Sequence, residues 1–428
     1  MTYWSGFSHA VSTRNSKRMC VCNPHIAPNE PYRGYSNVND CSSCRWIAIA
    51  CWRATGHREK IMMKTFNSER VDSLAYAVSL ECSNVGQQCY GHFDKIAWVT
   101  DLFDKQENQV MVDRLFQLES DDTYQVRVRP AGKDECDSLY RWVVEIRLAN
   151  KSKHHPVLLM IYFGPTNKKR GAVRMELSPQ HYLAEQMSDL FIWLGRKGRI
   201  GKYLYRGLRN SWVTSIHYAL DVMGMKLHDF LIGLAKVHDG DFNDPYGKQE
   251  GMRLGATTVV ASIYEKVNAP ELSLEERRAT AQLTLDESQH ECFLRLELRL
   301  SPGKQKLMLS NLSQMENLVS RLAFYDRKLI RDRKLDPDFA KRLKRMTVPR
   351  ARKTFRPASE LNGRAVSPTK EAAKKRIDKV MKTYLVDLFD AEAIWHKLPL
   401  VIEKLGILGQ PQYWQPDIRK KWLKSRGK

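Results

Sequence analysis

The chain has 428 residues, 43% of them hydrophobic, and a formal net charge of +22. This length allows two or three domains, and the positive charge makes nucleic acid the first partner to expect. No apolar run reaches the length of a membrane span and no apolar signal segment opens the chain, so we expect a cytoplasmic protein with reduced cysteines and no membrane partner.

Five of the nine cysteines lie in residues 1–61, which we treat as a separate N-terminal segment. Two close pairs, Cys20 with Cys22 and Cys41 with Cys44, could surround a zinc ion. The first pair is one residue too close for the usual spacing. The alternative is free cysteines in an extension that is not essential, because the methionines at 62–63 would also serve as a start.

Residues 62–310 alternate strand-like and helix-like segments. We expect an α+β domain, mainly an antiparallel sheet with helices packed on it. Strands are predicted at 141–149, 155–165, 215–222, 257–263 and 293–300. Helices are predicted at 178–195, with Ser178 as N-cap, and at 225–236 and 269–288.

A short internal echo links the strand predicted at 293–300 with an earlier stretch of the chain. The stretch VRMELSP at 173–179 returns as LRLELRLSP at 294–302, each with Arg and Glu two apart on one face and a Ser-Pro at its end. Two duplicated strand–helix halves would produce this echo, and so would chance.

A glycine-rich basic segment, GRKGRIGKYLYRGLRNSW at 195–212, differs from a phosphate-binding P-loop. Five residues rather than four separate Gly195 from Gly201, and Tyr203 replaces the expected Ser or Thr. We interpret it as a mobile basic and aromatic loop that lies along a nucleic-acid backbone.

In the strand SIHYALDV, alternation places His217 and Asp221 on one face. The pair could form the edge of a metal site or an ordinary hydrogen-bonded strand end. In FLRLELRL, Arg295, Glu297 and Arg299 point away from four leucines, which also fits a solvated ladder of charges.

The strand at 257–263 ends in Tyr264, Glu265 and Lys266. Tyr264 and Lys266 share a face with Ser262, and Glu265 points to the other. A phenol beside a cation and carboxylates suits phosphodiester transfer, because tyrosine has a pKa of about 10 and needs help to attack phosphorus.

Residues 311–428 predict a basic, mostly helical DNA-binding region. A long helix is expected at 304–334, a linker near 349–368 and another helix at 370–389. Between Arg327 and Lys353, twelve Lys or Arg stand against three Asp. The chain closes on YWQPDIRKKWLKSRGK, in which tryptophans interrupt the basic residues.

The order VTSIHYALD, VVASIYEK, FLRLELRL resembles the rolling-circle replication initiators of filamentous phages (the gene II type) and of plasmids, over about residues 72–320. That family implies an origin-specific nicking enzyme that forms a covalent phosphotyrosine with Mg2+ or Mn2+. By this resemblance Tyr264 is the nucleophile, Lys266 its basic neighbour, and Asp221 and Glu297 are metal ligands.

The family's first-strand aspartate falls at His217, so His217 or Glu265 could complete the metal site. Tyr325 is a rival nucleophile that lies outside the family order and in an expected helix. The resemblance implies binding of double-stranded origin DNA and single-stranded DNA, with a host helicase and polymerase as partners. The residues expected to contact DNA are Arg196, Lys197, Arg199, Lys202, Arg206, Arg209, Arg295, Arg299, Lys341, Arg342, Lys344 and Arg345.

Two other functions fit the same charge. A non-catalytic repressor or copy-control protein of a phage or plasmid would not need Tyr264, Asp221 and Glu297. An RNA-binding module would show no preference for supercoiled origin DNA.

Overall fold

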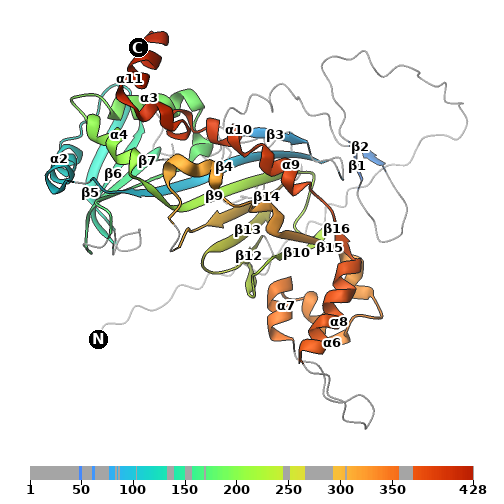
Figure 1. The fold of residues 1–428 in the computed structure, drawn as a ribbon. Coiled ribbons are helices and arrows are strands. Elements are labelled where there is room, and N and C mark those ends of the chain that lie inside the picture. The colour runs from blue at the N-terminus through green and yellow to red at the C-terminus, as the bar shows by residue number, and fades with distance from the viewer. Residues whose placement is uncertain are drawn as a thin grey trace, which may run out of the picture. The chain divides into compact units, whose positions relative to one another are not determined.

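The computed structural model describes residues 48–50, 60–62, 77–81, 84, 87–102, 104–132, 139–149, 157–167, 170–243, 251–265, 293–303, 306–355 and 370–427 (Figure 1). These residues belong to one unit, Ser43–Lys428. Three predicted features lie outside the described residues. They are the two cysteine pairs expected to bind zinc, the residue Lys266, and the helix expected at 269–288.

An eleven-stranded antiparallel sheet dominates the fold, which confirms the α+β prediction. Its strands follow the order β11-β12-β13-β14-β9-β4-β8-β7-β6-β5, and β3 pairs with β4. They span β3 Val78–Glu81, β4 Gln88–Thr100, β5 Tyr124–Pro130, β6 Tyr140–Leu148, β7 Leu159–Pro165, β8 Val173–Leu177, β9 Trp212–Met223, β11 Gly240–Asn243, β12 Gly251–Leu254, β13 Val259–Glu265 and β14 Phe293–Leu300.

The sheet consists of two topologically equivalent halves that meet at β4 and β9. Outward from this seam the first half runs β4-β8-β7-β6-β5, and the second runs β9-β14-β13-β12-β11. The equivalent positions are Lys95 and His217, Ala97 and Ala219, Val99 and Asp221, Tyr162 and Tyr264, Arg174 and Arg295, and Glu176 and Glu297. The echo between 173–179 and 294–302 therefore marks a repeated set of strands.

The strands repeat, but in the described part of the chain the helices of the two halves differ. The described helices span α2 Lys105–Phe116, α3 Ala184–Leu194, α4 Lys202–Arg209, α6 Pro337–Leu343, α7 Val348–Thr354, α8 Lys370–Thr383, α9 Ala391–His396, α10 Leu398–Glu403 and α11 Pro416–Ser425. Single 3-10 turns lie at η1 Pro179–His181, η4 Leu309–Gln314, η5 Val319–Arg321, η6 Arg327–Arg331, η7 Gly406–Gly409 and η8 Pro411–Trp414. Among the described residues, no helix has the length and apolar character needed to cross a bilayer.

The two faces of the large sheet differ in polarity. Trp98 contacts Phe191 of α3, with ring centroids 6.2 Å apart, and Tyr218 contacts Trp395 of α9 at 5.3 Å. Helices therefore cover the face formed by these aromatic residues and bury its apolar side chains. Strand alternation turns His217 and its neighbours in β14 to the other face, which is polar.

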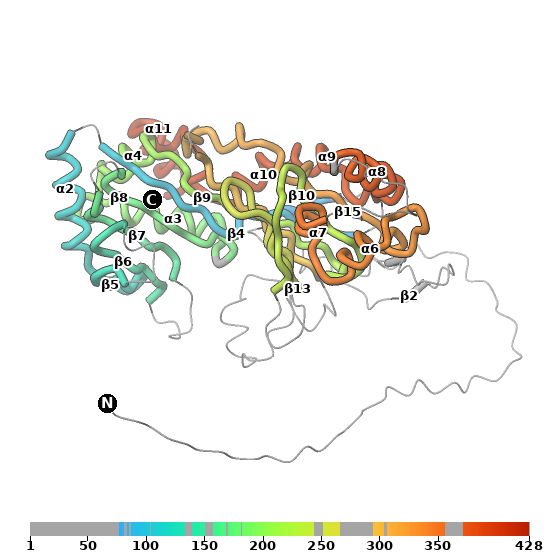
Figure 2. Tube along the Cα trace, turned by 90° about the horizontal axis from the view of Figure 1, so that it is seen from below, coloured from blue at the N-terminus to red at the C-terminus, as the bar shows by residue number. Residues whose placement is uncertain are grey.

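A second core lies in the helical unit of α6, α7 and α8. It is built from buried side chains that include Leu329, Phe339, Phe355 and Ile377. A three-stranded sheet of β10 Phe230–Leu234, β15 Leu322–Asp326 and β16 Leu385–Val386 leads into it. The short strands β1 Ala48–Ala50 and β2 Lys60–Met62 pair separately. Figures 1 and 2 place α6–α8 and α11 at opposite ends of the large sheet.

The five strands predicted from the sequence are confirmed, and so is the helix that begins at Lys370. The helix predicted at 178–195 begins only at Ala184, where the Gln186 side chain accepts from the Leu183 amide; Ser178 makes no side-chain cap. The segment at 195–212, expected to be a mobile loop, is a turn followed by α4. The expected linker begins inside α7, and its residues 356–368 lie outside the described part.

Two helix predictions are wrong. Residues 225–236 contain β10, and 304–334 contain 3-10 turns and β15, in which Tyr325 lies. The two strands pair with each other, Leu231 opposite Tyr325. A short apolar run fits a helix or a strand equally well, and here a partner about ninety residues away decides between them.

Candidate functional site

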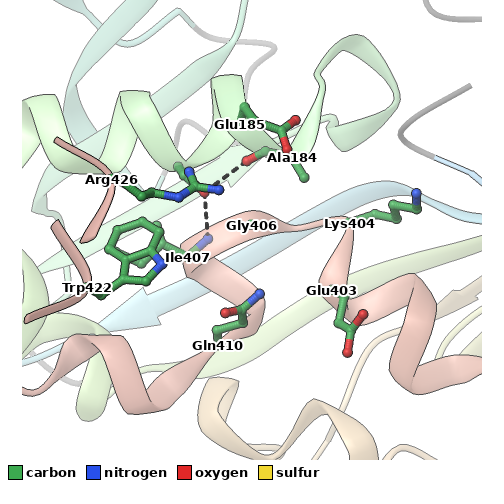
Figure 3. Close-up of a pocket in the computed structure, with 10 residues that line it drawn as sticks. Ala184, Glu185, Glu403, Lys404, Gly406, Ile407, Gln410, Trp422 and Arg426 are labelled. Carbon is green, nitrogen blue, oxygen red and sulfur yellow. Dashed lines mark hydrogen bonds between the residues drawn. The ribbon is translucent and has the colours of Figure 1, made fainter. Parts of the chain in front are cut away.

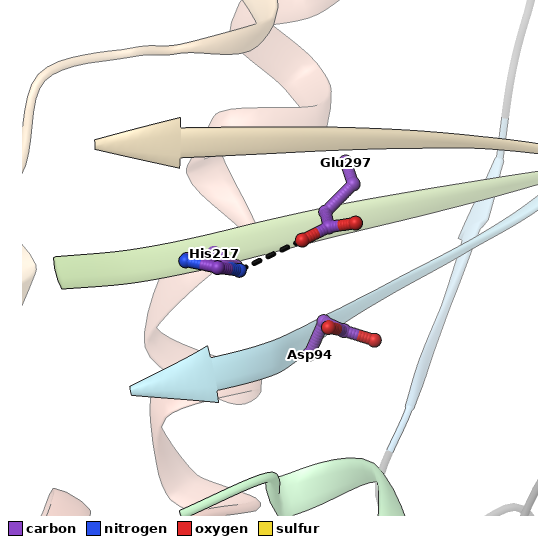
Figure 4. Close-up of side chains that lie close together, drawn as sticks. All are labelled: Asp94, His217 and Glu297. Atoms are coloured by element: carbon purple, nitrogen blue, oxygen red, sulfur yellow. Dashed lines mark hydrogen bonds and ion pairs between the residues drawn. The ribbon is translucent and has the colours of Figure 1, made fainter. Parts of the chain in front are cut away.

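Three side chains on the polar face of the sheet form a group that could hold a metal ion. Asp94, His217 and Glu297 each offer a ligand atom, and these atoms lie within 4.8 Å of one another (Figure 4). They come from the adjacent strands β4, β9 and β14. The pairing of β4 with β9 is irregular between Phe93 and Lys95, so a bulge at Asp94 re-aims its carboxylate.

The Glu297 carboxylate is the centre of this group. His217 Nδ1 lies 2.7 Å from its Oε1, and Arg299 donates to both oxygens over 2.9 and 3.2 Å. Burial by itself would raise the pKa of Glu297, but the hydrogen bonds from His217 and Arg299 lower it to about 2. The side chain, 4% exposed, is therefore ionised at neutral pH.

The phenol of Tyr264 lies at the edge of the group. Its hydroxyl donates to Glu297 Oε2 over 3.4 Å. β13 places Ser262 directly opposite Glu297 and Tyr264 opposite Arg295. Burial raises the pKa of Tyr264 well above its ordinary value, against the opposing charge of Arg295. The phenol is thus held in its protonated form and needs an activating group in order to attack.

Arg295 is fully buried and fixes two carboxylates. Its Nε and Nη2 each donate to Asp221 over 2.7 Å, and its Nη1 donates to Asp94 over 3.0 Å and to Gln180 over 2.9 Å. Asp221, expected to bind metal, thus has both oxygens bonded to a guanidinium. Arg295, expected to contact DNA, presents no surface to it in this structure.

Glu265 and Tyr325 lie apart from the group. Glu265 Oε1 accepts from the backbone amide of Leu227 over 3.0 Å, on the face opposite Tyr264, as strand alternation predicts. Tyr325 lies in the separate three-stranded sheet. Of the proposed metal ligands, the structure brings together His217 and Glu297, and it adds Asp94.

The donor set fits a divalent cation. Carboxylate oxygens suit Mg2+ and Mn2+, and the imidazole nitrogen of His217 favours the transition metal. His217 Nδ1 bonds to Glu297 in this structure, so a cation held by that nitrogen would replace this hydrogen bond.

The equivalent positions in the first half carry a different chemistry. Lys95 pairs with the Glu176 carboxylate, and Arg174 Nη2 donates to the same group over 3.0 Å. Burial would raise the pKa of Glu176, but Lys95 and Arg174 lower it. Two cations neutralise this carboxylate, and Lys95 stands where His217 lies in the second half.

The basic residues of 196–209 lie on the turn after α3 and on α4. Arg196, Lys197 and Lys202 are exposed. The other three have partners: Arg199 binds Asp121 over 3.2 Å, Arg206 binds Glu107, and Arg209 donates to Gln415 over 3.1 Å.

The basic residues expected on a long helix lie on α6 and the turn that follows. Lys341, Lys344 and Arg345 are exposed, and Arg342 pairs with Asp338 over 2.8 Å. Arg299 lies beside the candidate site, where it contacts Glu297.

The comparisons with known proteins find similar chains among solved structures. No family model matches the chain, and no curated protein matches it. A solved structure described as the rolling circle replication initiator protein from Geobacillus stearothermophilus is similar to it, with 12% identity and a TM-score of 0.29, over 60% of this chain and 92% of that one.

Proposed function

We propose that the chain is a metal-dependent DNA-nicking enzyme that starts rolling-circle replication. The observation that carries the proposal is the hydrogen bond of 3.4 Å from the Tyr264 phenol to Glu297, whose carboxylate forms a group with Asp94 and His217. A partly buried tyrosine bonded to a carboxylate of a metal-ligand group combines a nucleophile with a cation site, the two parts that phosphodiester transfer to tyrosine uses. The order of the three strand motifs in the sequence supports the same reaction.

In the proposed step, the Tyr264 oxygen attacks the phosphorus of one phosphodiester. The bond from phosphorus to the 3′ oxygen breaks, a 5′-phosphotyrosine forms, and the 3′ oxygen leaves as a hydroxyl. Glu297 accepts the hydrogen bond of the phenol and orients it, and the phenol proton passes through solvent to the departing 3′ oxygen, because a carboxylate with a pKa of about 2 cannot keep it. Mg2+ or Mn2+ bound by Asp94, His217 and Glu297 would neutralise charge on the scissile phosphate.

The covalent link preserves the energy of the cleaved bond, so the same residues can rejoin the strand after one round. Origin DNA would lie along the polar face, held by cations such as Arg299. The freed 3′ hydroxyl would prime a host polymerase behind a host helicase.

One observation favours the competing function of a DNA-binding repressor without catalysis. Glu297 already has His217 and Arg299 as partners, as a purely structural ion network would. Metal-dependent nicking separates the two functions.

The test is a nicking assay on a supercoiled plasmid that carries the element's own intergenic region. Wild type, Tyr264→Phe and Tyr325→Phe are each assayed with Mg2+, Mn2+ or EDTA, and an SDS-stable protein–DNA adduct is sought. We expect wild type and Tyr325→Phe to nick and crosslink only with metal, and Tyr264→Phe to do neither. Tight binding without nicking would favour the repressor, and an adduct on Tyr264→Phe would refute the assigned nucleophile.

A further inference from the structure

The C-terminal segment carries a layered group of aromatic rings and cations that the proposed reaction does not use. The rings of Tyr413 and Trp422 stack with centroids 4.7 Å apart and planes 24° from parallel. The guanidinium of Arg426 lies 4.9 Å from the Trp422 ring. Nearby, Arg419 covers the ring of Tyr205 in α4 at 3.6 Å.

The surface around these rings is strongly positive. Residues 416–427 hold five Lys or Arg and one acidic residue, Asp417. Of the five, Lys420, Lys421, Lys424 and Arg426 are exposed. The chain just before α11 is anchored to α4 through the bond from Arg209 to Gln415, so these cations stand on a fixed base.

A cavity of about 270 Å3 opens beside this group, between α3, the turn η7 and α11 (Figure 3). Trp422 and Arg426 form one side, and Glu185, Gln410 and Lys404 contribute polar groups to its walls. Its base is rigid, because Ser188 accepts from the Ile407 amide over 3.1 Å. The cavity is small for a drug-sized ligand but suits a single flat ring with hydrogen-bonding edges.

We infer that this surface, the C-terminal platform (Tyr413, Trp422, Arg426 and the lysines of α11), binds single-stranded nucleic acid. A base stacks on Trp422 in the place of Arg426, its edge faces the cavity, and the lysines hold the backbone. Bases in a duplex are already stacked on each other and cannot use such a ring, so the platform selects single strands.

The inference goes beyond the proposed reaction and does not depend on it. The platform adjoins α3 and α4, on the helix-covered side of the sheet, whereas the Tyr264 site lies on the polar side. An acidic protein segment is the other occupant that the charge would admit, but an aromatic ring beside a base-sized cavity favours nucleic acid.

The test uses the full chain with Tyr264→Phe, so that cleavage cannot interfere, and follows fluorescence anisotropy of a labelled oligothymidine and of a labelled hairpin duplex. We expect Trp422→Leu to weaken single-strand binding about ten-fold or more and duplex binding less than two-fold, because one base stack is lost. Trp422→Phe keeps an aromatic face and restores most of the affinity. Thermal unfolding confirms that each variant is folded.

A second variant keeps the test decisive if Trp422→Leu does not fold. Lys420→Ala/Lys421→Ala/Lys424→Ala should lower the slope of log affinity against log salt by up to about two for the single strand. If a variant lost the same affinity for the duplex as for the single strand, the platform would act only through its positive charge, and the inference would be overturned. Unchanged single-strand binding by both variants would also overturn it and would favour the acidic protein segment.

Discussion

The two halves of the large sheet have the same strand order and register, yet among the described residues only the carboxylate of the second half, Glu297, lies in a group that could hold a metal. Tyr162, Arg174 and Glu176 occupy the positions of Tyr264, Arg295 and Glu297. In the first half, Tyr162 donates to the sulfur of Met160. The backbone frame is therefore not what makes the candidate site.

Two substitutions account for the difference. Val99 stands where the second half has Asp221, so Arg174 has no aspartate there and binds Glu176. Lys95 replaces His217 and adds a second cation to the same carboxylate. In the second half Asp221 holds Arg295 away from Glu297. A buried aspartate whose two oxygens bond to Arg295 therefore helps to keep that guanidinium from Glu297.

The largest contrast is expected from removing the equivalent carboxylates. Glu297→Gln should weaken Mn2+ binding by more than about 100-fold and abolish nicking, because a central anionic ligand is lost. Glu176→Gln should change neither, since Lys95 and Arg174 already neutralise that group. Isothermal titration measures Mn2+ binding by the two variants, and the plasmid assay measures their nicking. Equal losses in the two variants would show that the two carboxylates do not differ in function.

The buried arginines should differ in their contribution to stability. Arg295→Met leaves Asp221 and Asp94 without their guanidinium and should lower the free energy of unfolding by about 3–5 kcal/mol. Arg174→Met should cost about 1 kcal/mol, because Lys95 still pairs with Glu176 and the site is partly solvated. Urea unfolding provides both values, and a reversed order would mean that Arg295 does not hold the network together.

Acid should act on the second half through Glu297. Its folded pKa of about 2 lies below its ordinary value of 4.5, so its contribution to stability is complete above about pH 4.5 and is lost as the pH falls towards 2. Glu297→Gln should remove that part of the slope of unfolding free energy against pH. Denaturant unfolding between pH 2 and 6 provides the comparison, and parallel curves would contradict the low pKa.

The smallest effect is expected at Lys95, whose side chain is 34% exposed. Lys95→Ala should lower the free energy of unfolding by no more than about 1 kcal/mol, the usual range for a solvent-screened ion pair. Nicking should persist, because the pair belongs to the first half. A loss of nicking would show that the two halves are coupled through the adjacent positions Lys95 and His217.

The sequence predicts the strands of the second half well because their alternation is strong. In β14 four leucines face the core and the charged residues, including Glu297, face away. Tyr264 ends a strand rich in β-branched residues. The side chains of Glu297 and Tyr264 can therefore be assigned to the polar face from the sequence. Strand alternation also separates Glu265 from Tyr264. These are local signals that need no knowledge of the partner strand.

The missing parts of the site depend on pairing between distant segments. Asp94 lies at a bulge in β4, a strand not recognised in the sequence, and its carboxylate reaches the site only because β4 neighbours β9. Asp221 could be recognised as an ion-pair partner only from its register opposite Arg295, 74 residues away. In the sequence, the similarity between residues 173–179 and 294–302 is the signal that relates the positions of the two halves.

The most direct test of the central claim is to identify the residue that carries the DNA. The SDS-stable adduct would be formed with Mn2+ on origin DNA, digested with nuclease and trypsin, and analysed by mass spectrometry. The account predicts nucleotide mass on Tyr264, in the tryptic peptide that runs from Leu254 to Lys266. Nucleotide mass on Tyr325 or Tyr162, or no adduct despite metal-dependent nicking, would contradict it.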